Sequence, residues 1–232
     1  MIEYDSVDES TNMYGIFNVP IYKSQVVNQE KINSIFSNLD LSQYTKRIQT
    51  GAKKEAPYWN CNAITGCDYI NEDADYGWIE EFMSVIKPHI ENYINATLAT
   101  NKPFSYVCTQ PWINVYERGD FQELHCHVHG RNVISFSYFH KLPLDDPGCG
   151  KFMFKNPNYQ KNFGGQDDEY ITTAVGNLWP NEKQGDLLIF PSWLEHLVSP
   201  HNCDDKRITV SGNIAFYRTG DESNEQSVEV MK

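Results

Sequence analysis

Several features are missing from this chain of 232 residues, and each absence excludes a class of protein. No hydrophobic run approaches the eighteen residues that a membrane-spanning helix needs, and the N-terminus lacks the basic and apolar regions of a secretory signal. Basic residues are scarce, since 19 Lys and Arg stand against 31 Asp and Glu and give a net charge of −12. Because nucleic acid is bound by surfaces rich in Lys and Arg, this balance argues against nucleic acid as the main partner.

Closely spaced cysteine pairs are also missing. Scattered cysteines are typical of reduced thiols and not of a disulfide framework, so we predict a cytoplasmic protein. A hydrophobic content of 40% with 13% aromatic residues is that of a globular protein, and the length allows one large domain. The six cysteines are Cys61, Cys67, Cys108, Cys126, Cys149 and Cys203.

The N-terminal part of the chain carries two helical patterns. Residues 1–13 are acidic and polar and are interpreted as a flexible leader, and residues 14–22 are rich in β-forming types. Asn28 can cap a short helix, and apolar residues at helical spacing predict a longer helix over about 76–100. Pro88 should kink or split this second helix. Its continuous apolar stripe predicts that it lies against a sheet.

From residue 105 onward the pattern changes to short strands separated by Gly and Pro turns, which is typical of a sandwich or barrel. The insert over 157–180 is too long and polar for a tight turn and is typical of a lid or binding loop. Residues 218–232 are interpreted as a flexible tail, which leaves 14–217 as a single domain. The predicted strands are 105–110, 112–116, 121–127, 133–139, 151–154, 186–190 and 207–217.

Three histidines form the main candidate for a functional site. His125 and His127 are two positions apart on a predicted strand, so their side chains share one face. His196 lies some seventy residues later, near the end of another strand. Two histidines on one strand and a distant third can build an open metal site, and imidazole suits iron, zinc and copper alike. Two other ligand sets remain open, one that pairs His127 with His129 and one in which Glu123 replaces a histidine.

The remaining histidines are interpreted without a metal role. His129 and His140 are predicted to be solvent-exposed. His89 lies on the apolar stripe of the second helix and is predicted to pack in the core. His201 follows a proline in a polar turn and is predicted at the surface.

Arg207 begins a strand whose polar and apolar residues alternate strictly. Arg207, Thr209, Ser211 and Asn213 share one face, and the other face is apolar. A polar face is normally solvated, but a barrel that holds a charged ligand turns such a face inward. The guanidinium fork suits a carboxylate, and the hydroxyl of Thr209 could bond to the same oxygens.

His125 and His127, then His196, then ten intervening residues to Arg207 form an order that resembles the double-stranded β-helix 2-oxoglutarate/Fe(II) dioxygenases. A small group of phage and bacterial oxygenases of this superfamily is more similar still. The likeness covers most of 14–217. The segments that carry it are Ile16 to Ile21, Trp112 to Tyr116 with Gly119 to Gln122, Phe190 to His196, and Arg207 to Asn213. The last two of these segments are its most specific parts.

The resemblance implies a jelly-roll fold with flanking N-terminal helices and an enzyme that uses Fe(II), 2-oxoglutarate and O2. It implies that Arg207 binds the far carboxylate of 2-oxoglutarate, with Thr209, Asn213 and Tyr138 as further cosubstrate-binding residues. Three departures stand out: His127 occupies the position of a carboxylate ligand, the loop 128–132 is longer, and Phe136 replaces a common glycine. We expect the longer loop and Phe136 to border the pocket.

The expected reaction is hydroxylation of a substrate with formation of succinate and CO2. The substrate, a small molecule or a peptide, cannot be read from the sequence. Two other functions remain open: a three-histidine metal dioxygenase or isomerase that does not use 2-oxoglutarate, and a non-catalytic phage-associated β-sandwich binding protein. If a phage encodes the chain, the predicted cytoplasmic location is the cytoplasm of the host cell.

Overall fold

The computed structural model describes residues 19–41, 63–65, 77–97, 104–109, 111–157 and 177–218. Within these ranges the chain forms two helices and eleven strands. The helices are α1 (Gln29–Asn38) and α2 (Trp78–Thr97). The strands are β1 (Tyr22–Gln25), β2 (Ile64–Thr65), β3 (Phe104–Cys108), β4 (Trp112–Tyr116), β5 (Gln122–His125), β6 (Asn132–Lys141), β7 (Phe152–Lys155), β8 (Asn177–Leu178), β9 (Asp186–Pro191), β10 (His196–Val198) and β11 (Arg207–Arg218).

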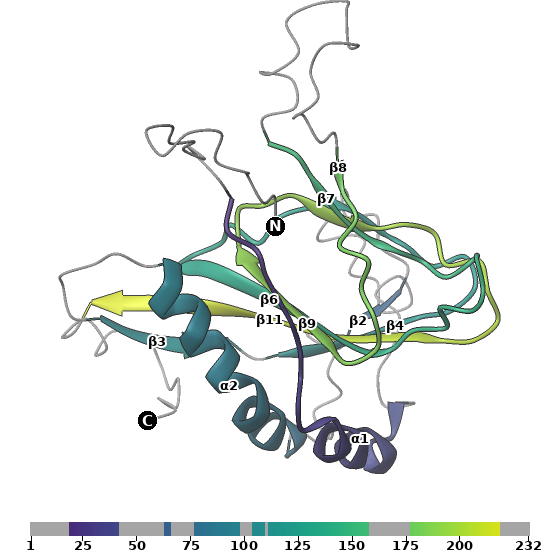
Figure 1. Cartoon of the computed structure of the whole chain (residues 1–232), viewed down its shortest axis with the longest axis horizontal. Helices are drawn as coiled ribbons and strands as arrows, with labels where there is room; N and C mark the ends of the chain where they lie inside the picture. Colours follow the sequence, from purple (N-terminus) through teal and green to yellow (C-terminus); the bar gives the residue numbers. More distant parts are fainter. Residues whose placement is uncertain are drawn as a thin grey trace, which may run out of the picture.

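The strands form two antiparallel sheets. The larger sheet has the order β1-β9-β6-β11-β4-β2, with β3 paired to the far half of β11, and the smaller has the order β5-β10-β7-β8. Chain neighbours such as β4 and β5 lie in different sheets, so the chain crosses repeatedly between them. The two curled sheets form a double-stranded β-helix, as the sequence predicts (Figure 1).

Both helices cover the outer face of the larger sheet (Figure 1). Apolar residues at helical spacing in α1 and α2 pack on strand residues such as Ile134, Val210 and Ile214. Pro88 lies inside one continuous helix, so the helix is not split there. Ile86 and Ile90 on either side of Pro88 are fully buried against the same sheet, and this packing favours one uninterrupted element.

A second apolar core lies between the two sheets. Strand alternation separates it from the first, because Leu187 and Ile189 of β9 face the helices, whereas Leu188 and Phe190 face inward. Aromatic rings from both sheets fill this inner core and surround one end of β10. Its members include Tyr116, Phe139, Phe152, Phe154, Leu188, Phe190, Leu194 and Val198.

The seven predicted strands match observed ones to within a few residues, whereas β2, β8 and β10 were not predicted. The β-rich segment predicted over 14–22 meets β1 only at its last residue, because β1 runs over Tyr22–Gln25. The short β10 consists of only His196–Val198 and continues from a tight turn, so it carries little pattern. The predicted leader lies outside the described residues, as do 14–18, most of the insert 157–180 and all but the first residue of the predicted tail. No helix of the described residues is long and apolar enough to cross a membrane.

Candidate metal centre and anion pocket

The structure brings His125, His127 and His196 together, with one potential ligand atom of each within 4.8 Å of the others. His125 ends β5, His127 follows two residues later, and His196 begins β10 opposite His125 in the strand register. The ring of His196 stacks on that of His127 at 5.0 Å, and is flanked on its other sides by rings of the inner core. The site therefore lies where β5 ends and β10 begins, against an aromatic wall.

Backbone carbonyls orient two of the three rings. The Nδ1–H of His125 donates to the carbonyl of Glu123 at 2.8 Å, and that of His196 donates to the carbonyl of Leu194 at 2.9 Å. These bonds fix the tautomer with the proton on Nδ1, so that Nε2 is the unprotonated nitrogen of both rings, as in protein metal sites. The Nε2 atoms of His127 and His196 are 3.2 Å apart. Metal bonds of about 2.1 Å at about 90° would put two nitrogens about 3 Å apart, so the geometry fits a shared cation.

Burial favours the neutral form of all three rings. Burial is the main cause that lowers the pKa of each ring, and neighbouring histidines add to this for His127 and His196. The pKa of His127 falls to about 3. Neutral imidazole is the form that ligates metal, so the rings are ready to bind at neutral pH.

The alternative ligand sets are not assembled. His129 is exposed and lies outside the histidine cluster, and the side chain of Glu123 is not part of it either. His140 is not solvent-exposed as predicted, because its ring stacks on Phe36 of α1 at 3.9 Å. The three-imidazole set fits Fe(II), because imidazole nitrogen is a suitable ligand for this ion.

Arg207 lies in the interior and is fully buried. Its guanidinium sits over the rings of Tyr116 at 5.0 Å and Phe139 at 5.5 Å. None of its three guanidinium nitrogens has a hydrogen-bond partner in the described part of the chain. A buried cation without a hydrogen-bond partner is strongly unfavourable, so this guanidinium is a candidate for binding an anion.

The polar face of β11 points inward and not into solvent. Thr209 and Asn213 are both buried on the face of Arg207. The Thr209 hydroxyl accepts a bond from the Asn114 amide at 3.2 Å, and the Asn213 side-chain oxygen accepts one from the Ser135 hydroxyl at 2.8 Å. In both bonds the residue of β11 is the acceptor, so its own donor hydrogens are not used in them.

Tyr138 and Phe136 lie elsewhere. Tyr138 pairs with Val210 in the sheet register and packs on Phe82 of α2 at 5.7 Å, on the helix side of the sheet. Phe136 lies on the same side, where a Cβ added at Gly212 would come within 2.5 Å of its ring. Neither residue shares the face of Arg207, because side chains alternate along β6. The expectation that Phe136 borders the pocket is therefore wrong, and the structure does not bring Tyr138 to the site.

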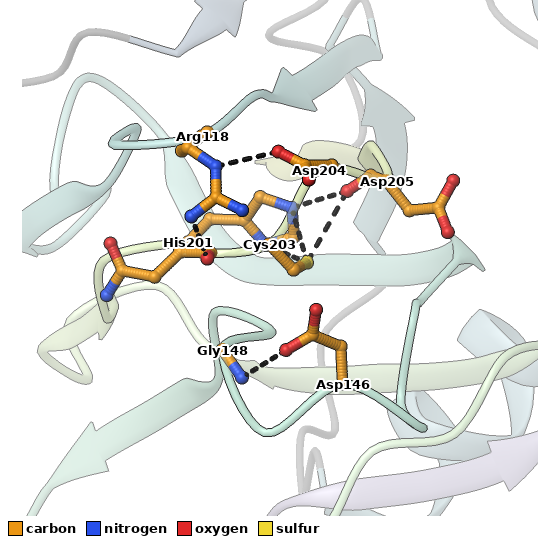
Figure 2. A network of polar contacts seen from close by, with 8 residues as sticks. Arg118, Asp146, Gly148, His201, Cys203, Asp204 and Asp205 are labelled. Atoms are coloured by element: carbon orange, nitrogen blue, oxygen red, sulfur yellow. Dashed lines mark hydrogen bonds and ion pairs between the residues drawn. The ribbon is translucent and has the colours of Figure 1, made fainter.

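The loop over 199–206 leads directly into Arg207, and His201 holds it in place (Figure 2). The prediction that His201 is at the surface is wrong, since it is fully buried. Its Nε2–H donates to the carbonyl of Asp205 at 2.6 Å, and its Nδ1 accepts from the Gly150 amide at 3.1 Å. Its backbone joins the loop over 117–121 through bonds to Gly119 and Asp120.

Fold and site together indicate a class of protein: an enzyme of the double-stranded β-helix type, with three histidines that could hold a metal ion and a buried arginine that has no hydrogen-bond partner in the described part of the chain. The comparisons agree with this. Residues 110–213 match the family model described as "Putative 2OG-Fe(II) oxygenase". A search of curated proteins finds no match.

Solved structures share the fold. SnoN, a non-heme alpha ketoglutarate dependent epimerase from nogalamycin biosynthesis, aligns with a TM-score of 0.54 and 12% identity over 92% of this chain and 89% of SnoN. HygX from Streptomyces hygroscopicus, solved with nickel and 2-oxoglutarate, aligns with a TM-score of 0.50 and 10% identity over 85% of this chain and 83% of HygX. The chain matches the 2OG-Fe(II) oxygenase family model over residues 110–213, and this match supports its assignment to the 2-oxoglutarate/Fe(II) oxygenase superfamily. It is an enzyme whose cofactors are Fe(II), 2-oxoglutarate and O2.

Proposed function

We propose that His125, His127 and His196 hold the Fe(II) of this oxygenase, and that Arg207 binds the distal carboxylate of 2-oxoglutarate. One observation supports this above all. Three neutral imidazoles converge on one point, and the same barrel encloses a guanidinium with no partner in the described part of the chain. The metal site needs a cation and the pocket needs an anion, so a chelating dicarboxylate that spans both satisfies each requirement.

Each residue has a defined task in this proposal. The carbonyls of Glu123 and Leu194 orient His125 and His196, so that the ligand nitrogens are placed before the metal arrives. Arg207 fixes the far end of the cosubstrate, and Thr209 and Asn213 are proposed as donors along the same face. The aromatic wall excludes water from the centre. When bound, Fe(II) supplies the O2 chemistry that couples decarboxylation of 2-oxoglutarate to oxidation of the substrate.

The experiment is an anaerobic titration of the purified protein. We expect about one equivalent of Fe(II) per chain, followed by a visible charge-transfer band when 2-oxoglutarate is added. Under O2, succinate should form. A protein that binds Fe(II) but gives neither band nor succinate would favour a three-histidine enzyme that does not use 2-oxoglutarate.

His127 allows a prediction about the unusual third ligand. His127→Asp should retain Fe(II), because a carboxylate also ligates iron, whereas His127→Ala should weaken Fe(II) binding by at least about tenfold. Iron content after anaerobic desalting measures both. His129→Ala is the matched control, since the exposed His129 lies outside the cluster. Equal iron content in His127→Ala and the parent would remove His127 from the ligand set.

The substrate remains a small molecule or a peptide of unknown identity.

We also propose one domain over 14–217 and a cytoplasmic location. The location is supported by Cys108, Cys126, Cys149 and Cys203, which are all free thiols in the described part of the chain. Gel filtration with limited proteolysis tests the single domain, and a stable fragment shorter than this range would contradict it.

A further inference from the structure

Gln122 is a buried residue with an unused hydrogen-bond donor. Its side chain is only 6% exposed, and its Nε2 atom has no partner in the described part of the chain. Six buried side-chain atoms of the described residues lack a partner, and four of them belong to Gln122 and Arg207. All four are nitrogen donors. Buried donors are nearly always paired, so this concentration indicates a ligand rich in acceptor oxygens.

The strand register turns Gln122 toward the interior. Gln122 lies opposite Val198, and His125 lies opposite His196, with an irregularity between the two pairs. His196 and Val198 are two residues apart on one face of β10, so their partners face the same side. The irregularity therefore directs both Gln122 and the metal-ligand candidate His125 into the barrel, although they are three positions apart.

Gln122 and Arg207 also lie at the same end of the barrel. Gln122 begins β5 after the loop over 117–121, and Arg207 begins β11 after the loop over 199–206. These loops are bonded to each other, because the Gly119 amide donates to the carbonyl of His201 at 2.7 Å and the His201 amide donates to that of Asp120 at 2.8 Å. The ring of Tyr116 contacts the guanidinium of Arg207, and Val198 lies opposite Gln122 in the strand register. Both Tyr116 and Val198 belong to the inner core.

We propose that Gln122 is a cosubstrate-binding residue, whose amide donates to the distal carboxylate of 2-oxoglutarate beside Arg207. This inference rests on the proposed function, and it adds a residue to the anion pocket. A carboxylate accepts hydrogen bonds only, so the amide nitrogen faces it and the amide oxygen faces away. A donor bond to a charged acceptor at a buried site corresponds to about a ten- to hundredfold effect on affinity.

The test compares two ligands on the anaerobic Fe(II) protein, 2-oxoglutarate and 2-oxobutyrate, which lacks the distal carboxylate. Gln122→Met keeps the length of the side chain and removes the donor. We expect it to weaken 2-oxoglutarate binding about ten- to a hundredfold and to leave 2-oxobutyrate binding within about twofold of the parent. Gln122→Glu should weaken 2-oxoglutarate binding further, because it places a like charge beside the carboxylate.

Gln184→Leu is the control, since Gln184 is an exposed glutamine outside the histidine cluster and the inner core, and it should bind both ligands as the parent does. Circular dichroism and melting temperature show that each variant is folded. If Gln122→Met binds 2-oxoglutarate as tightly as the parent, or loses both ligands equally, Gln122 is not a cosubstrate-binding residue. If the parent itself does not bind 2-oxoglutarate, the proposed function fails as well, and the two failures are thereby distinguished.

Discussion

Replacing His196 by alanine should abolish stoichiometric Fe(II) binding. His196 is the most buried of the three histidines, and its ring is held by a carbonyl on one side and by Phe152 at 5.3 Å on another. Removal of a residue that only orients a ligand typically lowers metal affinity about ten- to a hundredfold, so loss of a ligand itself should exceed about a hundredfold. The measurement is iron per chain after anaerobic reconstitution and desalting.

This substitution also removes a ring from the aromatic wall, so folding needs a separate check. His196→Gln fills most of the space and offers a matched variant that lacks the imidazole. Both variants should keep the far-ultraviolet circular dichroism of the parent while they lose iron. Undiminished iron in a folded His196→Ala protein would refute the proposed metal centre.

Much of the site could be predicted because the residues involved follow simple periodicities. The spacing of His125 and His127 indicated a shared direction, and the strict alternation of β11 indicated that Arg207 and Thr209 share a face. The structure agrees with both. Whether the polar face of β11 lies inward or in solvent depends on how the second sheet and the helices pack against it. The local sequence pattern of β11 does not contain this information.

The position of Tyr138 was not predicted correctly from the local sequence, because the two faces of β6 were not distinguished. Both faces of β6 are buried, so apolar content alone does not separate them. A signal was present, since Ser135, Ser137 and Phe139 form one alternating row and Tyr138 belongs to the other. The register assigns the serine row to the side of Asn213 and Thr209 and leaves Tyr138 with the helices.

His201 and Gln122 could not have been found by periodicity. His201 is buried because its loop is bonded to Gly119 and Asp120, some eighty positions earlier in the chain. Gln122 faces inward because the pairing of β5 with β10 is irregular, and a regular strand would put it on the face opposite His125. Both features depend on contacts between distant segments, which composition and spacing do not report.

Replacing Arg207 by methionine should change stability and 2-oxoglutarate binding in opposite directions. In the ligand-free protein the buried guanidinium has no partner in the described part of the chain, which is an unfavourable state. Arg207→Met fills similar volume without charge, so it should raise the free energy of unfolding of the metal-free protein. Urea unfolding of parent and variant measures this change.

The same substitution should weaken 2-oxoglutarate binding to the Fe(II) protein by at least about ten- to a hundredfold, because a charge-assisted bidentate contact contributes roughly 1.5–3 kcal/mol. Arg207→Lys should recover only part of the affinity, since an ammonium cannot reproduce the planar fork. Fe(II) affinity should change little, because Arg207 is outside the histidine cluster. Arg131→Ala is the control, as Arg131 is an exposed arginine that stacks on Tyr217. Identical 2-oxoglutarate titrations of parent and Arg207→Met would leave the three-histidine metal centre in place but remove the proposed anion pocket.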